Sequence, residues 1–197
     1  MRKQIIQIFL IILLIALVCA VFIYINLSKK NMEQNNKIKL SNNILPSNLI
    51  SEINLTSEAF ENNQAIPKQY SYKGKNINPP LLISNVPKGT KSLALIVDDP
   101  DAPVRIYVHW LVWNIPAETF KIEEGTLPQG SIQGLNDFQK NEYDGPYPPS
   151  GTHRYFFKLY ALDFILNLDK NSKKSDLENI MKGHILAETS LVGLYSK

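Results

Sequence analysis

Three aspartates and a histidine lie close together in the stretch 92–113, SLALIVDDPDAPVRIYVHWLVW. Asp99 and Asp101 lie in a loop that two prolines stiffen, because each proline fixes its own φ and restricts the residue before it. His109 follows on the next apolar run. A carboxylate that accepts one imidazole N–H fixes the role of the other ring nitrogen. The stretch therefore predicts an orienting carboxylate beside a histidine that is able to bind a ligand.

The same residues also have a purely structural explanation. Asp and Pro are common turn residues for backbone reasons, so a DPD loop alone is most often only a turn. A single histidine on an apolar strand is more often packed in the core than used for chemistry. A second cluster of the same kind is needed to favour a functional site.

That second cluster lies in residues 143–163, YDGPYPPSGTHRYFFKLYALD. Three prolines stiffen its entry, while Gly145 and Gly151 permit backbone conformations or close approaches that side chains would block. His153 and Tyr155 then open an aromatic, apolar strand. Two of the three histidines thus lie beside rigid loops, which predicts that the two loops meet in one shallow site.

Short apolar runs separated by Pro and Gly predict the elements that hold these loops. The runs 81–83, 93–97, 106–113 and 155–162, with a possible first strand in 50–60, favour an all-β sandwich or barrel. Near the end of the chain, Ser175 and Glu178 form a capping-box pattern before apolar residues at helical spacing. We expect a helix over 176–188 that packs on the sheets, with His184 in its packing face.

Composition excludes some classes of protein and leaves others open. The 197 residues are 44% hydrophobic and 20% charged, which is enough for one globular domain. A net charge of +3 without a block of like charges does not indicate nucleic-acid binding. Cys19 is the only cysteine, so an intrachain disulfide is excluded.

The N-terminal residues predict a membrane segment. Residues 5–25 are almost entirely apolar and uncharged after a short basic start, about the length of a membrane-spanning helix. A cleaved signal peptide is the alternative, but the apolar run is longer than a secretory core; Val18 before Cys19 disfavours a lipoprotein site. We expect a single-pass anchor in 1–27 with the domain on the outer side, a flexible polar tether in 28–48 and a domain in 49–197.

Five motifs occur in order between residues 99 and 195. They are DPDAP at 99–103, HW at 109–110, NIP at 114–116, GPYPPSGTHRY at 145–155 and HILAETSLVGLY at 184–195. With these motifs, residues 49–197 resemble the phosphatidylethanolamine-binding protein family, the family of the Raf kinase inhibitor proteins, and most closely its bacterial and archaeal branch.

The resemblance implies a mainly β fold, with two antiparallel sheets in a Greek-key sandwich and a C-terminal helix. It also implies a pocket for a small anionic group and, as an alternative function, inhibition of a kinase or protease through a protein surface. Tyr147 stands where a smaller residue is common in the family and would narrow the pocket mouth. The pocket residues carry over to Asp99, Asp101, His109, Gly145, His153 and Tyr155.

The residues support a binding role better than the two chemical alternatives. Zinc or manganese could use two His and two Asp, but the chain has no HExxH spacing and no cysteine pair. Hydrolysis lacks a G-x-S-x-G motif, and Ser131 and Ser150 lie in Gly/Pro-rich loops typical of turns. A weak hydrolase that uses Asp99 and Asp101 as an acid–base pair is the remaining alternative. We expect no cofactor and an anionic ligand, such as phosphate, a phospholipid head group or a phosphorylated residue. Histidine donors would bind it more tightly at mildly acidic pH.

Overall fold

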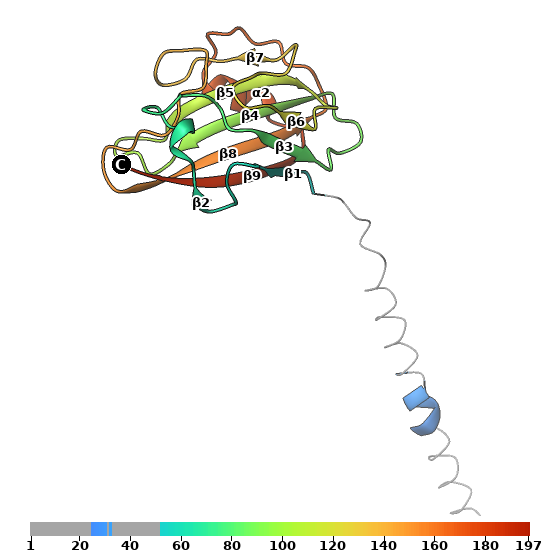
Figure 1. Ribbon diagram of the computed structural model, residues 1–197. Helices are drawn as coiled ribbons and strands as arrows, with labels where there is room; N and C mark the ends of the chain where they lie inside the picture. The colour runs from blue at the N-terminus through green and yellow to red at the C-terminus, as the bar shows by residue number, and fades with distance from the viewer. Residues whose placement is uncertain (1–24, 31, 33–51) are drawn as a thin grey trace, which may run out of the picture. The chain divides into compact units, whose positions relative to one another are not determined.

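The computed structural model describes residues 25–30, 32 and 52–197 (Figure 1). The chain divides into two units, 1–49 and 50–197. Most of the predicted anchor and tether lies outside the described residues. Residues 25–30 and 32 are helical and exposed, so the first residues of the predicted tether are helical, which fits a stretch without proline or glycine. No helix among the described residues is both long and apolar enough to span a bilayer.

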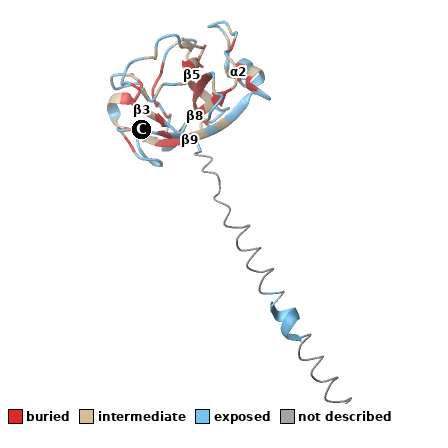
Figure 2. Cartoon of the chain, turned by 90° about the vertical axis from the view of Figure 1, so that its right-hand side faces the viewer, coloured by how far each residue is buried: buried red, intermediate tan, exposed pale blue. Residues whose placement is uncertain are grey.

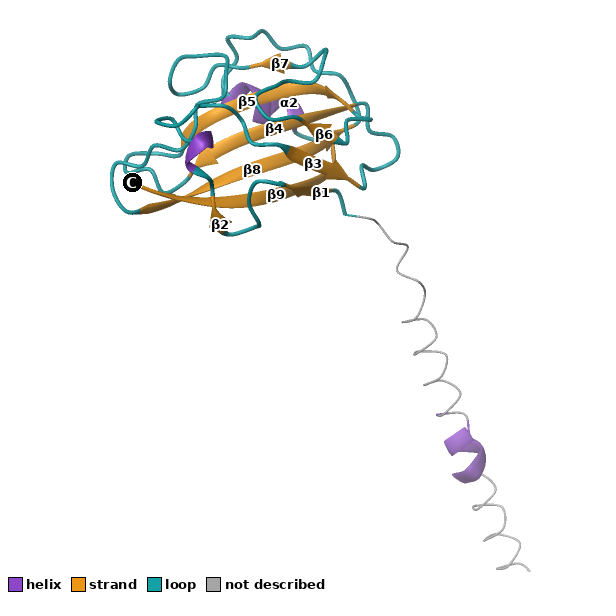
Figure 3. Cartoon of the chain, in the orientation of Figure 1, coloured by secondary structure: helices purple, strands orange, loops and turns teal. Residues whose placement is uncertain are grey.

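Residues 52–197 form two β-sheets and one α-helix (Figure 3). The small sheet has the strand order β1-β3-β6, and the large sheet has the order β2-β9-β8-β4-β5-β7. All pairings are antiparallel except that between β2 and β9. The strands are β1 Asn54–Thr56, β2 Gln64–Ala65, β3 Leu81–Ser84, β4 Ser92–Asp99, β5 Tyr107–Pro116, β6 Lys121–Ile122, β7 Ile132–Gln133, β8 Thr152–Leu162 and β9 Ile185–Ser196, with a 3-10 turn at Lys68–Tyr70.

Strand β4 is buried along its whole length because both faces of the large sheet are covered. Successive strand residues point to opposite faces. Leu93, Leu95 and Val97 pack toward the small sheet, while Ala94 and Ile96 pack toward helix α2, Lys174–Met181. Figure 2 shows buried residues along β5 and β8 and exposed residues on the outer side of α2. The domain is therefore a mainly β fold of two sheets with a helix on the far face of the large sheet.

The helix is shorter than the sequence pattern predicts. The expected apolar face is correct for Leu177 and Met181, which are buried, but the helix ends at Met181 instead of Glu188. Gly183, with φ of 81°, follows the end of the helix, as expected for a residue in the left-handed region. The chain then enters β9, so the helix is followed by the last strand of the sheet.

His184 consequently does not pack in a helix face. It is exposed just before β9, where its Nδ1 lies 2.8 Å from the Asp163 carboxylate and its ring lies on Phe164. The predicted capping pair is also wrong. The Asp176 carboxylate accepts from the Lys173 N–H at 2.8 Å, and Ser175 lies inside the helix.

The long predicted strands are confirmed, with small shifts at their ends. The expected first strand is only three residues long, and the two-residue strands β2, β6 and β7 have no clear pattern in the sequence. Segments of two residues carry too little hydrophobic periodicity to be recognised. The strands that matter for the site are β4, β5 and β8, which are adjacent in the large sheet.

Candidate functional site

A pocket of about 330 Å³ opens where the β4–β5 loop meets the loop before β8. Its walls combine one carboxylate, one histidine and one arginine with aromatic and apolar groups. The lining residues are Asp99, Ala102, Pro103, Val104, Arg105, Tyr107, His109, Phe138, Tyr147 and Pro149. The two stiff loops of the sequence pattern therefore meet at one pocket.

Asp99 and His153 form a buried pair behind the pocket wall. The Asp99 Oδ2 atom lies 2.7 Å from Nδ1 of His153, and both side chains are less than a tenth exposed. Oδ1 of Asp99 accepts the Asp101 N–H at 2.8 Å. Adjacent strands bring the pair together, since Asp99 ends β4 and His153 lies at the start of β8. This is the predicted orienting carboxylate, but it holds His153, and not His109.

A β-bulge places His109 at the pocket. Along β5, the register passes from Trp110 opposite Val97 to Val108 opposite Asp98, which leaves His109 as the extra residue. A bulge bends the strand and re-aims the side chain of the inserted residue. The His109 ring packs edge-on against Tyr155 of β8, with 5.2 Å between ring centroids. The bulge thus directs His109 toward the side of the sheet that carries Asp99 and Tyr155.

The hydrogen-bond partner of His109 is a main-chain carbonyl. Its Nδ1 lies 2.7 Å from the carbonyl oxygen of Asp144, and the Asp144 N–H donates back to the His109 carbonyl at 3.1 Å. Burial lowers the pKa of His109 below its ordinary value, which favours the neutral imidazole. The prediction of a carboxylate partner for His109 is therefore wrong, because a residue in a distant loop supplies the acceptor.

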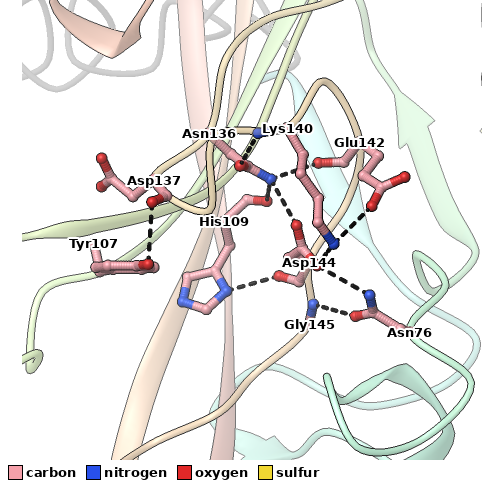
Figure 4. Close-up of polar contacts among 9 residues, drawn as sticks. All are labelled: Asn76, Tyr107, His109, Asn136, Asp137, Lys140, Glu142, Asp144 and Gly145. Atoms are coloured by element: carbon pink, nitrogen blue, oxygen red, sulfur yellow. Dashed lines mark hydrogen bonds and ion pairs between the residues drawn. The ribbon is translucent and has the colours of Figure 1, made fainter.

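Asp144 is held by a network of its own (Figure 4). Its fully buried carboxylate accepts from the Asn76 amide at 3.0 Å, from the Asn136 amide at 3.0 Å and from Lys140 Nζ at 3.2 Å. Asn136 and Lys140 lie in the same loop as Asp144, whereas Asn76 comes from a distant part of the chain. These donors fix the loop that carries the carbonyl acceptor of His109.

Tyr155 contributes a buried hydroxyl to the site. Its side chain is 1% exposed, and its hydroxyl has no hydrogen-bond partner among the described residues. Burial, and to a smaller extent the nearby Asp99 carboxylate, raises the pKa of Tyr155. It is therefore a neutral donor that lies beside Asp99 and His109 and has hydrogen-bonding capacity to spare.

Asp101 has a structural role instead of lining the pocket. Its carboxylate receives two hydrogen bonds from the Arg154 guanidinium, at 2.7 and 2.9 Å, and one from the Arg154 N–H at 2.9 Å. The hydrogen bonds from Arg154 lower the pKa of Asp101 to about 2. The pair ties the β4–β5 loop to β8. Asp101 thus supports the loop that presents Asp99.

Gly145 is also a structural residue. Its N–H donates to Asn76 Oδ1 at 2.8 Å, so this amide is not available to a ligand. The backbone of Tyr70 and Ser71 passes so close that a Cβ on residue 145 would lie 2.1 Å from the Tyr70 carbonyl oxygen. Only glycine fits there without movement of the backbone.

We expect Gly145→Ala to lower the free energy of unfolding by more than about 2 kcal/mol, because the clash is with main-chain atoms that cannot rotate away. Urea unfolding followed by circular dichroism measures it. Ser150→Ala, at an exposed position in the same loop, is the control and should change little. Equal stability of the two variants would show that the backbone around residue 70 adjusts freely.

The sequence pattern missed the aromatic wall of the pocket. Tyr107 and Phe138 pack edge-on at 5.1 Å, and Phe138 stacks on Tyr72 at 5.2 Å. Tyr147 lies at the mouth, as predicted, with Lys73 Nζ 4.9 Å from its ring centre. Phe138 lies in a loop between polar residues, where the sequence gives no periodic signal.

No cluster of three or more His, Cys, Asp or Glu side chains suited to a metal ion occurs among the described residues.

Comparison with known proteins gives the family. The profile of the phosphatidylethanolamine-binding protein family matches residues 56–196. The chain belongs to this family. All five motifs identified in the sequence, between residues 99 and 195, lie within the matched segment.

Members of the phosphatidylethanolamine-binding protein family that are similar to this chain occur in archaea and bacteria. A UPF0098 protein of Methanothermobacter thermautotrophicus is 49% identical over 150 residues, covering 74% of this chain and 99% of the relative. The crystal structure of a putative phosphatidylethanolamine-binding protein homolog from Chlamydia trachomatis is 42% identical, with a TM-score of 0.71 over 74% of this chain and 98% of that one. The structure of E. coli YbcL, described as a new member of the mammalian family, is 31% identical with a TM-score of 0.71, over 74% and 99%.

Proposed function

We propose that this domain is a binding protein that holds a small anionic group, such as phosphate or a phosphate ester, in the pocket beside Asp99 and His109. The observation that carries the proposal is a pocket of about 330 Å³ lined by Asp99 and His109. Behind its wall, His153 pairs with Asp99 and the unpartnered Tyr155 hydroxyl is buried next to the His109 ring. A buried hydroxyl without a partner costs about 1–3 kcal/mol, which a ligand oxygen would relieve. Arg105 adds a positive charge at the mouth, although Asp137 pairs with it at 2.8 Å.

Isothermal titration calorimetry of inorganic phosphate into the purified full-length chain tests the proposal. We expect saturable binding to the wild type and no measurable binding to His109→Ala. His184→Ala removes an exposed histidine away from the pocket and should bind as the wild type does. Unchanged heats for His109→Ala would overturn the proposal.

Tyr155→Phe tests the same proposal without disturbing the fold. The change removes only a hydroxyl that has no partner among the described residues, so stability should be kept or slightly raised. Phosphate should bind roughly five times more weakly, because one hydrogen bond of about 1 kcal/mol is lost. Full affinity in this variant would mean that Tyr155 does not contact the ligand.

The exposed rim of the pocket favours inhibition of a kinase or protease as a second candidate function. Val104 is 93% exposed, and Ile106 and Tyr147 are each nearly half exposed, which gives an apolar edge suited to protein contact. Inhibition assays against purified serine proteases and kinases test it. Ile106→Gln changes a rim residue that is not in the pocket lining and adds no charge, so it should weaken inhibition and leave phosphate binding unchanged. Inhibition unaffected by this variant would place the inhibitory surface elsewhere.

A further inference from the structure

Strand β9 is an edge strand over the first half of its length. On one side, β8 pairs with β9 from Ile185 to Ser196, whereas on the other side β2 pairs only with Gly193 and Leu194. Figure 1 shows β9 along the lower border of the large sheet, with β2 next to its C-terminal part. Residues 185–191 therefore have no neighbouring strand on that side within the part of the chain that the structure describes.

Main-chain groups of the free half point away from the sheet. In an antiparallel strand, alternate residues direct their N–H and C=O groups to opposite sides. The Val192 C=O accepts from the Asn63 N–H at 2.7 Å, and the Val192 N–H donates to Asn62 Oδ1 at 2.9 Å, so Val192 faces away from β8. By the same alternation Ser190 and Glu188 face this side, where neither has a main-chain hydrogen bond to any described residue. They offer two donors and two acceptors to an added strand.

Two hollows flank this edge, one on each face of the large sheet. The hollow on the face that carries α2 is shallow and includes Tyr160 and Glu188 in its lining. The hollow on the opposite face has a volume of about 260 Å³ and opens between β1 and β9, with Leu55, Phe60 and Leu191 as its apolar lining. Successive strand residues point to opposite faces, so an added strand would place alternate side chains over the two hollows.

Glu188 gives the edge a negative charge. Its side chain is exposed and makes no ion pair or hydrogen bond with residues 52–197. Lys158, diagonal to Glu188 on β8, is already paired with the buried Asp98 carboxylate at 2.9 Å. Oppositely charged side chains that face each other on adjacent strands attract. A Lys or Arg on an added strand would therefore supply the cation that Glu188 lacks.

The same charge disfavours a second copy of this chain as the occupant. Two β9 edges related by a two-fold axis at Glu188 would place two carboxylates directly opposite each other, which is destabilising. Residues 185–191 contain no Lys or Arg, so other registers of two such edges supply no such cation either. The edge also lacks proline, and its Leu186 is 43% exposed, so a strand of another protein can pair with it.

We propose that residues 186–190 of β9 bind an extended segment of a partner protein as an added strand. The segment carries Lys or Arg opposite Glu188, and the apolar residues that alternate with it lie over the hollow between β1 and β9. Main-chain hydrogen bonds to Glu188 and Ser190 hold the segment, and the ion pair selects it. This surface is separate from the anion pocket, because His153 pairs with Tyr195 at the other end of β9.

Amide NMR titrations of the full-length chain with two blocked peptides, TKVKVT and TEVEVT, test this proposal. We expect the lysine peptide to shift the amide signals of Glu188 and Ser190 and to bind at least threefold more tightly than the glutamate peptide. Glu188→Lys should reverse this preference. Glu118→Lys makes the same change of charge at an exposed residue in the loop after β5 and should leave the preference as in the wild type.

Ser190→Pro removes an outward N–H and should abolish binding of both peptides, with circular dichroism as the check on folding. Equal affinity of the wild type for the two peptides, binding of neither, or signal shifts confined to residues outside β9 would overturn the proposal. A dimer in sedimentation equilibrium that Ser190→Pro abolishes, with neither peptide bound, would identify a second copy as the occupant instead. Inorganic phosphate should not compete with the lysine peptide, and competition would place the peptide in the anion pocket.

Discussion

Asp144→Ala is expected to lower the free energy of unfolding by about 3 kcal/mol. The carboxylate is fully buried and accepts three hydrogen bonds, and removal of one partner from such a network typically costs about 3–5 kcal/mol. The lower end applies here, because Lys140 is partly exposed and can turn to water. Asn136 keeps other acceptors, among them the Glu142 carbonyl at 2.9 Å.

Urea denaturation of the purified variant measures the change, and Glu142→Ala is the matched control. The Glu142 carboxylate lies 3.0 Å from the same Lys140 ammonium, but it is more than half exposed, so its loss should have little effect. If the two variants were equally stable, burial of Asp144 would not contribute to the fold as argued. The pocket would then need another explanation for the fixed position of His109.

Much of the site could be predicted because it depends on strands with clear patterns. The alternation in β4 and β8 places Asp99, His153 and Tyr155 on the face that also carries Val97 and Phe157 of the core. That β4 and β8 are neighbours does not follow from periodicity, since 52 residues separate the end of one from the start of the other. The family resemblance supplied this part of the prediction.

The site predictions that were wrong depend on the direction of a side chain or on backbone atoms that are distant in the sequence. Asp99 ends β4 and Asp101 lies two residues further on in the loop, yet Asp101 turns out to Arg154 and Asp99 turns in to His153. A loop has no fixed period, so spacing cannot assign such directions. The His109 bulge and its acceptor, the Asp144 carbonyl, likewise become visible only when the strands are paired.

The end of the chain shows how a helical pattern can continue by chance. Leu177, Met181 and Ile185 have helical spacing, but Ile185 already belongs to β9. Gly183 between them was the available signal, because glycine with positive φ commonly ends a helix. Strand β9 is absent from the sequence-based prediction, and its eleven pairings with β8 define it in the structure.

The contrast between the two loop carboxylates gives a further prediction. Asp99→Ala is expected to lower the free energy of unfolding by about 2–4 kcal/mol, more than Asp101→Ala, although Asp101 accepts three hydrogen bonds and Asp99 accepts two. Burial decides the order. The loss of Asp99 leaves the imidazole of His153 and the N–H of Asp101 without partners where water is scarce, since both Asp99 and His153 are nearly inaccessible.

The carboxylate of Asp101, unlike that of Asp99, is accessible to water. Its side chain is 29% exposed and that of Arg154 is 53% exposed, so water can replace the hydrogen bonds when the carboxylate is removed. Parallel urea titrations of the two alanine variants at pH 7 measure the difference. A larger loss for Asp101→Ala would mean that closure of the β4–β5 loop by Arg154, and not the buried Asp99–His153 pair, is the main support of the pocket.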